Sequence, residues 1–572
     1  MKKIAKFLIV LGMMGQLSSC DYLDIVPDER AQESDTWTKE GEVRRYLYSC
    51  YGYLPANRTF GNSYWLAEEL TAVTKELFTT FKYGYYSPVS LGFTSNTWST
   101  IWNGIHQCYM FQESLKQVSN EYVTDEMKKQ YLAESNFLIA YYHFLSMRSY
   151  GPTMIIRSVI DLETPISGFP ERSSIDEVVA FINEKLDEAM SEGGLPTTWS
   201  GKDYGRATRL AALALKSRVY LYAASPLYNG NTEMYADFRS PLDGRQLIAQ
   251  EKSQAKWEIS ATQTKYAIDE VEKAKFHLYH DADAGEPSDA KPGLPNKAQR
   301  RLRYTNIDNQ TGNNPEIIWA DTRNDDYYGI QRRCPPRQTL GGKFAGISMT
   351  NCPTLQTIEA FYTKNGLPIN KDKTFDYDER YEYISAPENC DGNNYEDLVK
   401  YANFTPSSDK VMRLCTDREP RFYAWTTYHN GYFEFGKYNN EEISADPAKR
   451  AIRIHLLRDD PHGRGNRTDQ EYSISGFGNK KGVVPSAEWN VIEYPFPLFR
   501  LAELYLNYAE ALVELDRLSE AKVYLDKVRE RAGIPSVDEA WDKYSTNPGY
   551  QNTQEGMREI VRAERMNCLL YT

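Results

Sequence analysis

The chain has 572 residues, of which 79 are acidic and 67 are basic, so its net charge at neutral pH is −12. Lysine and arginine are scattered without forming a basic stripe, and this charge pattern gives no support to nucleic acid as a partner. The length suffices for two to four average domains or one large one. Beyond the N-terminus no run of eighteen apolar residues occurs, which excludes a transmembrane helix from the body of the chain.

The N-terminus has the pattern of an export signal. Three lysines precede an apolar stretch at 7–14 that is about half as long as a bilayer crossing requires. The run Leu17-Ser18-Ser19-Cys20 then resembles a bacterial lipobox, in which the cysteine sulfur is alkylated by a diacylglyceryl group. We therefore expect a signal peptide at 1–19 and lipidation of Cys20, so that the lipid is the only contact with the membrane. An ordinary secretory signal that contains a cysteine is the alternative.

The N-terminal half of the mature chain is predicted to be helical. Residues 20–35 read as an extended tether because Pro27 and its polar neighbours break any periodicity. Between 36 and 280, apolar residues recur at three-and-four spacing, most clearly at 125–150, where the pattern stops at Gly151-Pro152. Helices are expected at 40–53, 98–118, 125–150, 174–191, 208–224 and 254–276.

Residues 281–495 differ in character from the helical segment before them. Glycine, proline, asparagine and aspartate are frequent, and the apolar runs are short. This pattern predicts a large loop-rich insertion with a few short strands and helices. Loops of this size on a rigid scaffold commonly carry binding sites, so the region is predicted to bind the ligand.

The cysteines and histidines do not form a recognisable metal motif. The cysteines beyond Cys20 lack CxxC spacing, although disulfides are chemically allowed outside the cytoplasm. His277 and His280 stand near two aspartates, Asp281 and Asp283, but a helix end followed by an acidic turn explains them better than a metal site. The same stretch resembles a fragment of a calcium loop that lacks its bidentate glutamate, which leaves calcium as a weak alternative. No cofactor and no metal are predicted.

Helical pattern resumes in the C-terminal segment, 496–567. Two antiparallel helices are expected at 498–516 and 518–531, with the small residues Ala509 and Ala521 where the helices approach each other. This unit resembles a tetratricopeptide repeat, although a lone helical hairpin would look similar. Together with the earlier helices it predicts a mainly α fold, a tetratricopeptide-like helical scaffold that carries the loop-rich insertion.

Several stretches together resemble the SusD/RagB family of outer-membrane nutrient-binding lipoproteins of Bacteroidetes. They occur in the order of the family over nearly the whole chain: Cys20-Asp21-Tyr22-Leu23-Asp24, Ala133 to Phe144 with Tyr150-Gly151-Pro152, Gly205-Arg206-Ala207-Thr208, Phe499 to Ala511, and Val528 to Gly533. The resemblance implies a surface-exposed glycan or peptide site on a helical fold. It also implies a SusC-like TonB-dependent transporter as partner, with the protein lipid-anchored in the outer membrane.

The C-terminus departs from the family pattern. After Ile560 to Arg565 the family continues through a further helix and an aromatic segment, whereas this chain stops at Thr572. Residues 568–572, Cys-Leu-Leu-Tyr-Thr, resemble a translated transposon-end adapter. We therefore expect a truncated chain with a non-native tail; a natural C-terminus is the alternative.

Two polar, aromatic clusters suit a sugar ligand, because aromatic faces stack on pyranose rings while amides, carboxylates and guanidinium groups bind hydroxyl pairs. The tryptophans Trp98, Trp102 and Trp319 are instead predicted to pack in the core. The predicted ligand-binding residues are Tyr83, Tyr85 and Tyr86 in the first cluster, and Arg323, Asn324, Asp325, Tyr327 and Tyr328 in the second.

No catalytic motif is found in a supporting context of strands and helices. Paired carboxylates such as Glu68 and Glu69 are adjacent, face apart on a helix, and arise by chance among 79 acids. The sequence therefore predicts a protein that binds glycan without catalysis and delivers it to a transporter. A surface glycoside hydrolase is the alternative, and a purely structural adaptor is a third possibility.

Overall fold

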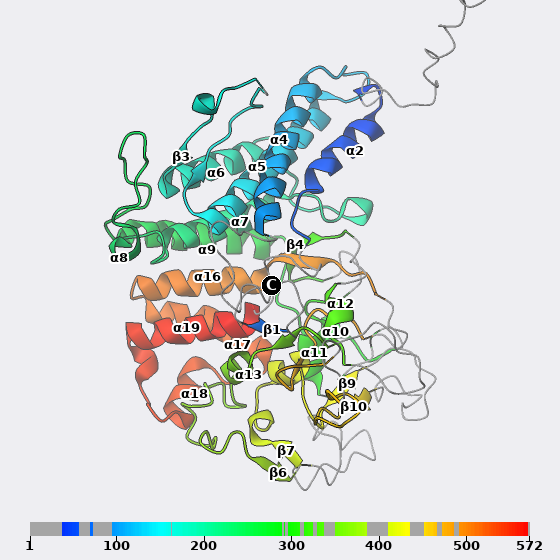
Figure 1. Ribbon diagram of the computed structural model, residues 1–572, viewed down its shortest axis with the longest axis vertical. Helices are drawn as coiled ribbons and strands as arrows, with labels where there is room; N and C mark the ends of the chain where they lie inside the picture. Colours follow the sequence, from blue (N-terminus) through cyan, green and yellow to red (C-terminus); the bar gives the residue numbers. More distant parts are fainter. Residues whose placement is uncertain are drawn as a thin grey trace, which may run out of the picture.

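The protein is mainly helical (Figure 1). The computed structural model describes residues 37–56, 69–72, 94–161, 163–288, 291, 294, 296–308, 314–323, 329–336, 349–385, 410–434, 451–465, 472–485 and 491–569. The predicted signal peptide, the tether and Cys20 lie outside these ranges. The domain boundaries given above stay predictions.

The N-terminal half of the fold is a layer of helices, each within a few residues of its predicted range. Hydroxyl side chains begin three of them: Thr124, Ser174 and Thr208 each accept a hydrogen bond from a backbone N–H in the first turn. Gly151, with a φ of 72°, ends the longest helix at the predicted stop. The helices are α2 (Glu40–Tyr51), α4 (Thr94–Lys116), α5 (Asp125–Tyr150), α6 (Ile175–Ala189), α7 (Arg209–Ala224) and α9 (Gln254–Lys273).

The C-terminal segment contributes α16 (Leu501–Glu514), α17 (Leu518–Ala532), α18 (Val537–Tyr544) and α19 (Gln554–Leu569). Ala509 and Ala521 are fully buried, and α16 packs directly on α17, which confirms the predicted close approach. Gly533 ends α17 with a φ of 75°, a conformation that favours glycine. Packing of α16 against α9 joins this unit to the N-terminal layer, and the tetratricopeptide-like prediction is confirmed.

One hydrophobic core runs through both ends of the chain. The same buried cluster contains residues of α2 to α9 and residues of α16 to α19. Polar contacts reinforce the junction: Asn507 donates to the Ser217 hydroxyl at 3.1 Å, and Arg218 donates to Glu503 at 2.6 Å. The two helical segments therefore form a single packed body, with the loop-rich insertion leaving from it and returning to it.

The predicted start of the C-terminal helix at Leu498 is wrong. Residues Phe496–Arg500 form a strand, β12, which pairs antiparallel with β4 (Ile317–Asp321) in the register Phe496↔Asp321 and Arg500↔Ile317. Four of the five β12 residues are buried, because one side of the strand faces the helices and the other faces the insertion. The helix begins only at Leu501.

The insertion is made of short elements, as predicted. Its strands form two-stranded antiparallel pairs, and it has a smaller core of its own around Phe422 and Trp425. Its described elements are α10 (Asp281–Ala284), α11 (Lys297–Tyr304), β4, α12 (Ile330–Arg333), β5 (Cys352–Pro353), α13 (Leu355–Ala360), β6 (Tyr383–Ser385), β7 (Lys410–Met412), α15 (Pro420–Trp425), β8 (Thr426–Thr427), β9 (Tyr432–Glu434), β10 (Ala451–Arg453) and β11 (Gly478–Asn479). Outside it lie β1 (Leu70–Thr71), which pairs with β5, the pair β2 (Thr153–Met154) and β3 (Arg172–Ser173), and α8 (Thr232–Tyr235).

A buried group of four charged side chains joins the insertion to the C-terminal helices. Arg421 of α15 donates to Glu419 and, at 2.5 Å, to Glu564 of α19. Arg529 of α17 lies 3.3 Å from the other oxygen of Glu564. All four side chains are at most 1% exposed, so each charge depends on its partners for the solvation that water would otherwise supply.

A second buried ion-pair group lies at the start of β4. Glu316 is fully buried and accepts from Arg500 at 2.9 Å and from Arg531 at 2.8 Å. The two guanidinium groups lower the pKa of the Glu316 carboxyl, against the opposing effect of its burial. Arg529 and Arg531, both in the Val528 to Gly533 stretch, thus pair with buried carboxylates of other segments.

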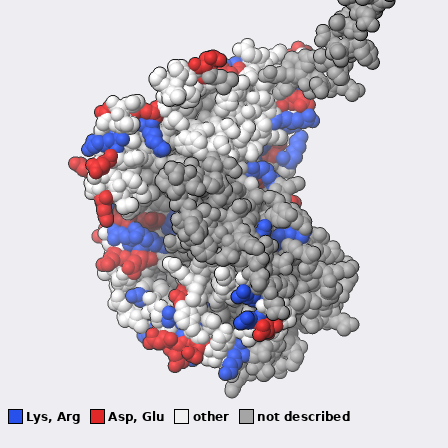
Figure 2. Space-filling view, in the orientation of Figure 1, with Lys and Arg blue, Asp and Glu red and all other residues white. Residues whose placement is uncertain are grey.

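Charges on the described surface are mixed. Figure 2 shows acidic and basic side chains interspersed over the visible face, in line with the scattered pattern of the sequence. Among the described helices, none combines the length and apolarity that a membrane crossing requires. The described cysteines are all buried: Cys50, Cys108, Cys334, Cys352, Cys415 and Cys568.

Candidate functional site

A cavity of about 560 Å³ opens beside β4. Its walls come from three segments that are far apart in the sequence, namely the loop at 197–208, the end of α9 at 274–276, and residues 314–320. The volume lies within the range of about 300–1,000 Å³ that small-ligand sites occupy. Since β4 also leads directly into the predicted binding loop at 323–328, the cavity and that loop are neighbours along the chain.

Aromatic side chains line this cavity. Trp199, Tyr204 and Phe276 are half-buried and contribute to its walls. Burial raises the pKa of Tyr204 to about 12, so its hydroxyl is neutral at physiological pH and can both donate and accept. Flat apolar faces beside neutral hydroxyls and peptide groups are the combination that sugar rings require.

The position of Trp199 is fixed by two contacts. Its indole N–H donates to the Ala207 carbonyl at 2.9 Å, and the Arg206 guanidinium lies over its ring at 4.1 Å from the centroid. A guanidinium over an aromatic ring is attracted to its face and helps to hold the ring in place. The indole is therefore held in one orientation in the cavity wall.

Arg206 is in turn held by a buried network. It donates to the fully buried Glu134 of α5 and, at 2.8 Å, to Asp203. The Tyr51 hydroxyl donates to Glu134 at 2.6 Å and accepts from the Ala207 amide at 2.9 Å. The network ties α2, α5 and the loop before α7 together, so the wall that carries Trp199 rests on the helical core.

Gly205 brings the same loop against the end of β4. Its φ is 99°, and a Cβ added there would lie 2.7 Å from the Thr322 hydroxyl oxygen. The Gly205 carbonyl accepts a hydrogen bond from the Trp319 indole at 2.9 Å. A larger residue would push the loop away from β4 and open the cavity wall.

The structure places Arg323 directly after β4, where it holds the strand end. Its Nε and one Nη2 hydrogen donate to Asp321 at 2.9 and 2.6 Å. The remaining donors reach the carbonyls of Gly52, Leu54 and Pro55, at the end of α2. All five N–H donors of the guanidinium group thus have protein acceptors, so this arginine positions the start of the predicted binding loop.

The other predicted ligand-binding residues lie outside the described residues, and their role stays a prediction: Tyr83, Tyr85, Tyr86, Asn324, Asp325, Tyr327 and Tyr328. Trp319 is 2% exposed and packs edge-on against Phe137 at 5.0 Å, as the core prediction requires. Trp102 packs against the same core. The rings of Trp98 and Trp102 lie side by side, with their centroids 5.3 Å apart.

Sequence reasoning missed Trp199, Tyr204 and Phe276. A signal was present for the first of them, because Trp199 is the single aromatic residue in the stretch 193–201, which is rich in glycine, proline, serine and threonine. An aromatic residue in such a loop has no helical face to join, which favours a ligand-facing role. Phe276, at the end of α9, carries no comparable signal.

The family models match two separate parts of the chain. A model described as the SusD family matches residues 315–570, from the start of β4 to the end of α19. A second model, described as starch-binding and associating with the outer membrane, matches residues 21–221. No curated protein matches the chain.

Several solved structures share the fold. BT4246 is 28% identical over 93% of this chain and 87% of that chain, with a TM-score of 0.73. A SusD-like protein of Bacteroides fragilis, BF3747, is 20% identical over 94% of this chain and 85% of its own, with a TM-score of 0.64. A laminarin-binding SusD-like protein is 16% identical over 94% and 89%, with a TM-score of 0.52. At 20% and 16% identity the likeness concerns the fold alone.

Proposed function

Because the chain belongs to the SusD/RagB family, we propose that it binds an oligosaccharide or polysaccharide at the cell surface without catalysis. In this proposal the protein passes the glycan to a SusC-like TonB-dependent transporter for nutrient uptake. The observation that carries it is the open, aromatic-walled cavity beside β4, next to the predicted binding loop. The family model described as starch-binding, which matches residues 21–221, supports glycan as the ligand class.

The chemistry of the cavity favours binding over hydrolysis. Its described lining residues supply aromatic rings, hydroxyls, peptide groups and the cations Lys275 and Arg206, and none of them carries a carboxylate. Glycoside hydrolysis requires a pair of carboxyl groups about 5–10 Å apart across the scissile bond.

A surface glycoside hydrolase remains the second candidate. Incubation of the purified protein with a panel of glycans, with binding and product release both measured, separates the two functions. Turnover that a single carboxylate substitution abolishes would establish the hydrolase. Retention of a transporter in a pull-down without any glycan affinity would instead establish an adaptor.

Replacement of Trp199 by Ala is expected to weaken glycan binding about tenfold, since loss of one aromatic stacking surface costs about 1.4 kcal/mol. Affinity electrophoresis and calorimetry against the best ligand of the panel measure this change. Phe276→Ala is a second variant in the same cavity that leaves the Arg206 stack intact. Tyr122→Ala is the matched control, because Tyr122 is 39% exposed and lies outside the cavity.

The outcomes of this experiment distinguish an error in the location of the site from an error in the proposed function. Unchanged glycan affinity in both cavity variants would show that the glycan binds elsewhere on the protein. The Tyr327→Ala and Tyr328→Ala variants then test the predicted loop. Absence of affinity for every glycan in the wild-type protein would reject glycan binding itself.

Replacement of Cys20 by Ala is expected to release the protein from the membrane fraction. We propose that lipid on Cys20 is the anchor, and several acyl chains together hold a protein to the bilayer almost irreversibly. Fractionation of cells that express the variant measures the release, and growth on the glycan measures uptake. Glycan affinity in vitro should stay at the wild-type value. A variant that stays in the membrane fraction would show that another segment anchors the protein.

A further inference from the structure

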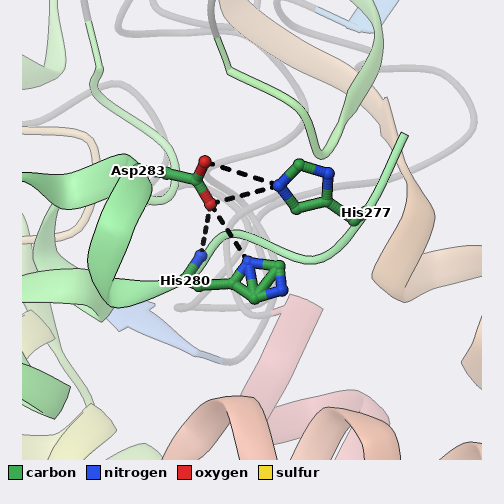
Figure 3. A group of neighbouring side chains, drawn as sticks. All are labelled: His277, His280 and Asp283. Carbon is green, nitrogen blue, oxygen red and sulfur yellow. Dashed lines mark hydrogen bonds and ion pairs between the residues drawn. The ribbon is translucent and has the colours of Figure 1, made fainter. Parts of the chain in front are cut away.

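Three side chains that bind metals well meet on the surface just after α9. His277 lies in the connection from α9 to α10, His280 precedes α10, and Asp283 lies within it. Their nitrogen and carboxylate oxygen atoms all lie within 4.8 Å of one another. Figure 3 shows the Asp283 carboxylate facing both imidazole rings. The sequence pattern predicts a helix end with an acidic turn. A helix, α10, does begin at Asp281, and the three side chains converge beside it.

The distances fit a small tetrahedral ion. His277 Nε2 lies 3.4 Å from Asp283 Oδ2, and His280 Nδ1 lies 3.2 Å from the same oxygen. Metal–ligand bonds of about 2.0–2.1 Å at tetrahedral angles place neighbouring ligand atoms about 3.3 Å apart. The side chain of His280 is 57% exposed, which lets its ring adjust to close the third edge.

In its neutral form with the hydrogen on Nδ1, His277 turns the lone pair of Nε2 toward Asp283. Nδ1 of His277 lies 3.3 Å from the carbonyl oxygen of Lys275, and a carbonyl only accepts, so Nδ1 carries the hydrogen. In the neutral ring Nε2 is then an acceptor, and it faces a carboxylate oxygen that is also an acceptor. A cation between the two resolves this mismatch, and a carbonyl partner on the other ring nitrogen is the usual support of a metal-binding histidine.

Neighbouring contacts hold the group in place. The His280 backbone N–H donates to Asp283 Oδ2 at 2.7 Å, which orients the carboxylate. The His277 amide donates to the Pro315 carbonyl at 3.1 Å, which holds its segment against the residues that precede β4. Asp281 is paired with Arg301 at 2.8 Å and so is engaged elsewhere.

We propose that His277, His280 and Asp283 bind one divalent transition-metal ion, with Zn²⁺ as the best fit. Two imidazoles and one carboxylate suit Zn²⁺ and its first-row neighbours, whereas calcium and magnesium prefer sites made of oxygen alone. Three protein ligands leave the fourth position open to water or to a further ligand. The exposed fractions of the two imidazoles, 45% and 57%, place that position toward solvent.

Calorimetric titration of the metal-stripped full chain with Zn²⁺, after removal of any polyhistidine tag, tests the site. We expect one equivalent to bind and its affinity to fall at least tenfold in Asp283→Asn and in the double variant His277→Ala with His280→Ala. Binding of Co²⁺ should give the strong visible absorption of a tetrahedral ion, and the double variant should lose it. His106→Ala, which removes an exposed histidine of α4, is the matched control and should leave the titration unchanged.

A second group of histidines provides a further control. His455 lies between His429 and His462, with ring centroids 6.3 and 6.2 Å away. Loss of Zn²⁺ binding in His455→Ala, with wild-type binding in the double variant, would overturn the proposal. Equal affinity in the wild-type protein and the double variant, or no binding by the wild type, would overturn it as well.

Discussion

Replacing Arg421 with Met should lower the free energy of unfolding by about 3–5 kcal/mol, the usual cost of removing one partner from a buried ion pair. Arg421 is the only one of the four clustered side chains that contacts both Glu419 and Glu564 in the described structure. Among the described residues, its loss leaves Glu419 with no ion-pair partner and Glu564 with Arg529 alone. Burial already raises the pKa of the Glu419 carboxyl, which shows how poorly this site solvates a negative charge.

Urea and thermal unfolding of the purified variant measure this loss. Arg45→Ala is the matched control, because Arg45 and Glu42 form an ion pair of 2.8 Å between exposed side chains of α2. We expect the control to cost no more than about 1 kcal/mol. Neutralising both carboxylates in the Arg421→Met background, with Glu419→Gln and Glu564→Gln, should restore part of the stability. Equal stability of Arg421→Met and Arg45→Ala would contradict this prediction, because it would mean that the buried carboxylates are solvated without Arg421.

Acidification should destabilise the protein between about pH 6.5 and 4, and His143 should account for about 3 kcal/mol of the loss. His143 is fully buried in α5, where its Nδ1 donates to the Ile139 carbonyl at 2.8 Å and its Nε2 accepts from the Ile156 amide at 3.3 Å. A proton on Nε2 would point at that amide hydrogen. Burial lowers the pKa of His143 to about 4.

The sign of this effect follows from proton binding. Below pH 6.5 the unfolded chain protonates this histidine and the folded protein does not, so stability falls with pH until the folded pKa near 4 is reached. Burial also lowers the pKa of His462 to about 4, which adds a second contribution over the same range. Urea unfolding at a series of pH values measures the slope.

A substitution separates His143 from the other titrating groups. His143→Gln should reduce the slope between pH 6.5 and 4 by up to about 1.4 kcal/mol per pH unit, the value for one proton. His106→Gln, at an exposed position of α4, should leave the slope unchanged. An unchanged slope in His143→Gln would mean that the folded protein accepts this proton as readily as the unfolded chain.

Most of the helical scaffold could be predicted from the sequence, because strong periodicity coincides with clear end signals. Thr124 and Gly151 bound α5 where the sequence predicts it, and Ala509 and Ala521 mark the close approach of α16 and α17. The error at Leu498 has a different origin. Phe496 and Phe499 are buried by a strand partner nearly 180 residues earlier in the chain, and local periodicity carries no information about such a partner.

The candidate site was less predictable, because its walls meet only in the folded protein. Trp199, Phe276 and the residues of β4 belong to three distant segments, and their convergence depends on the packing of α7, α9 and α16. Arg323 shows the opposite limitation. Its residue type suited a ligand, but three of its five donors are taken by carbonyls at the end of α2, which no spacing rule connects to it.

The shared core of the two helical segments also constrains how the protein folds. Ser217 and Asn507 are 290 residues apart, yet they meet between the same helices. The apolar faces of α7 and α9 therefore stay uncovered until α16 has been synthesised. Contacts of such long range slow folding and leave apolar surface open to aggregation meanwhile. The protein is thus expected to depend on chaperones while it folds.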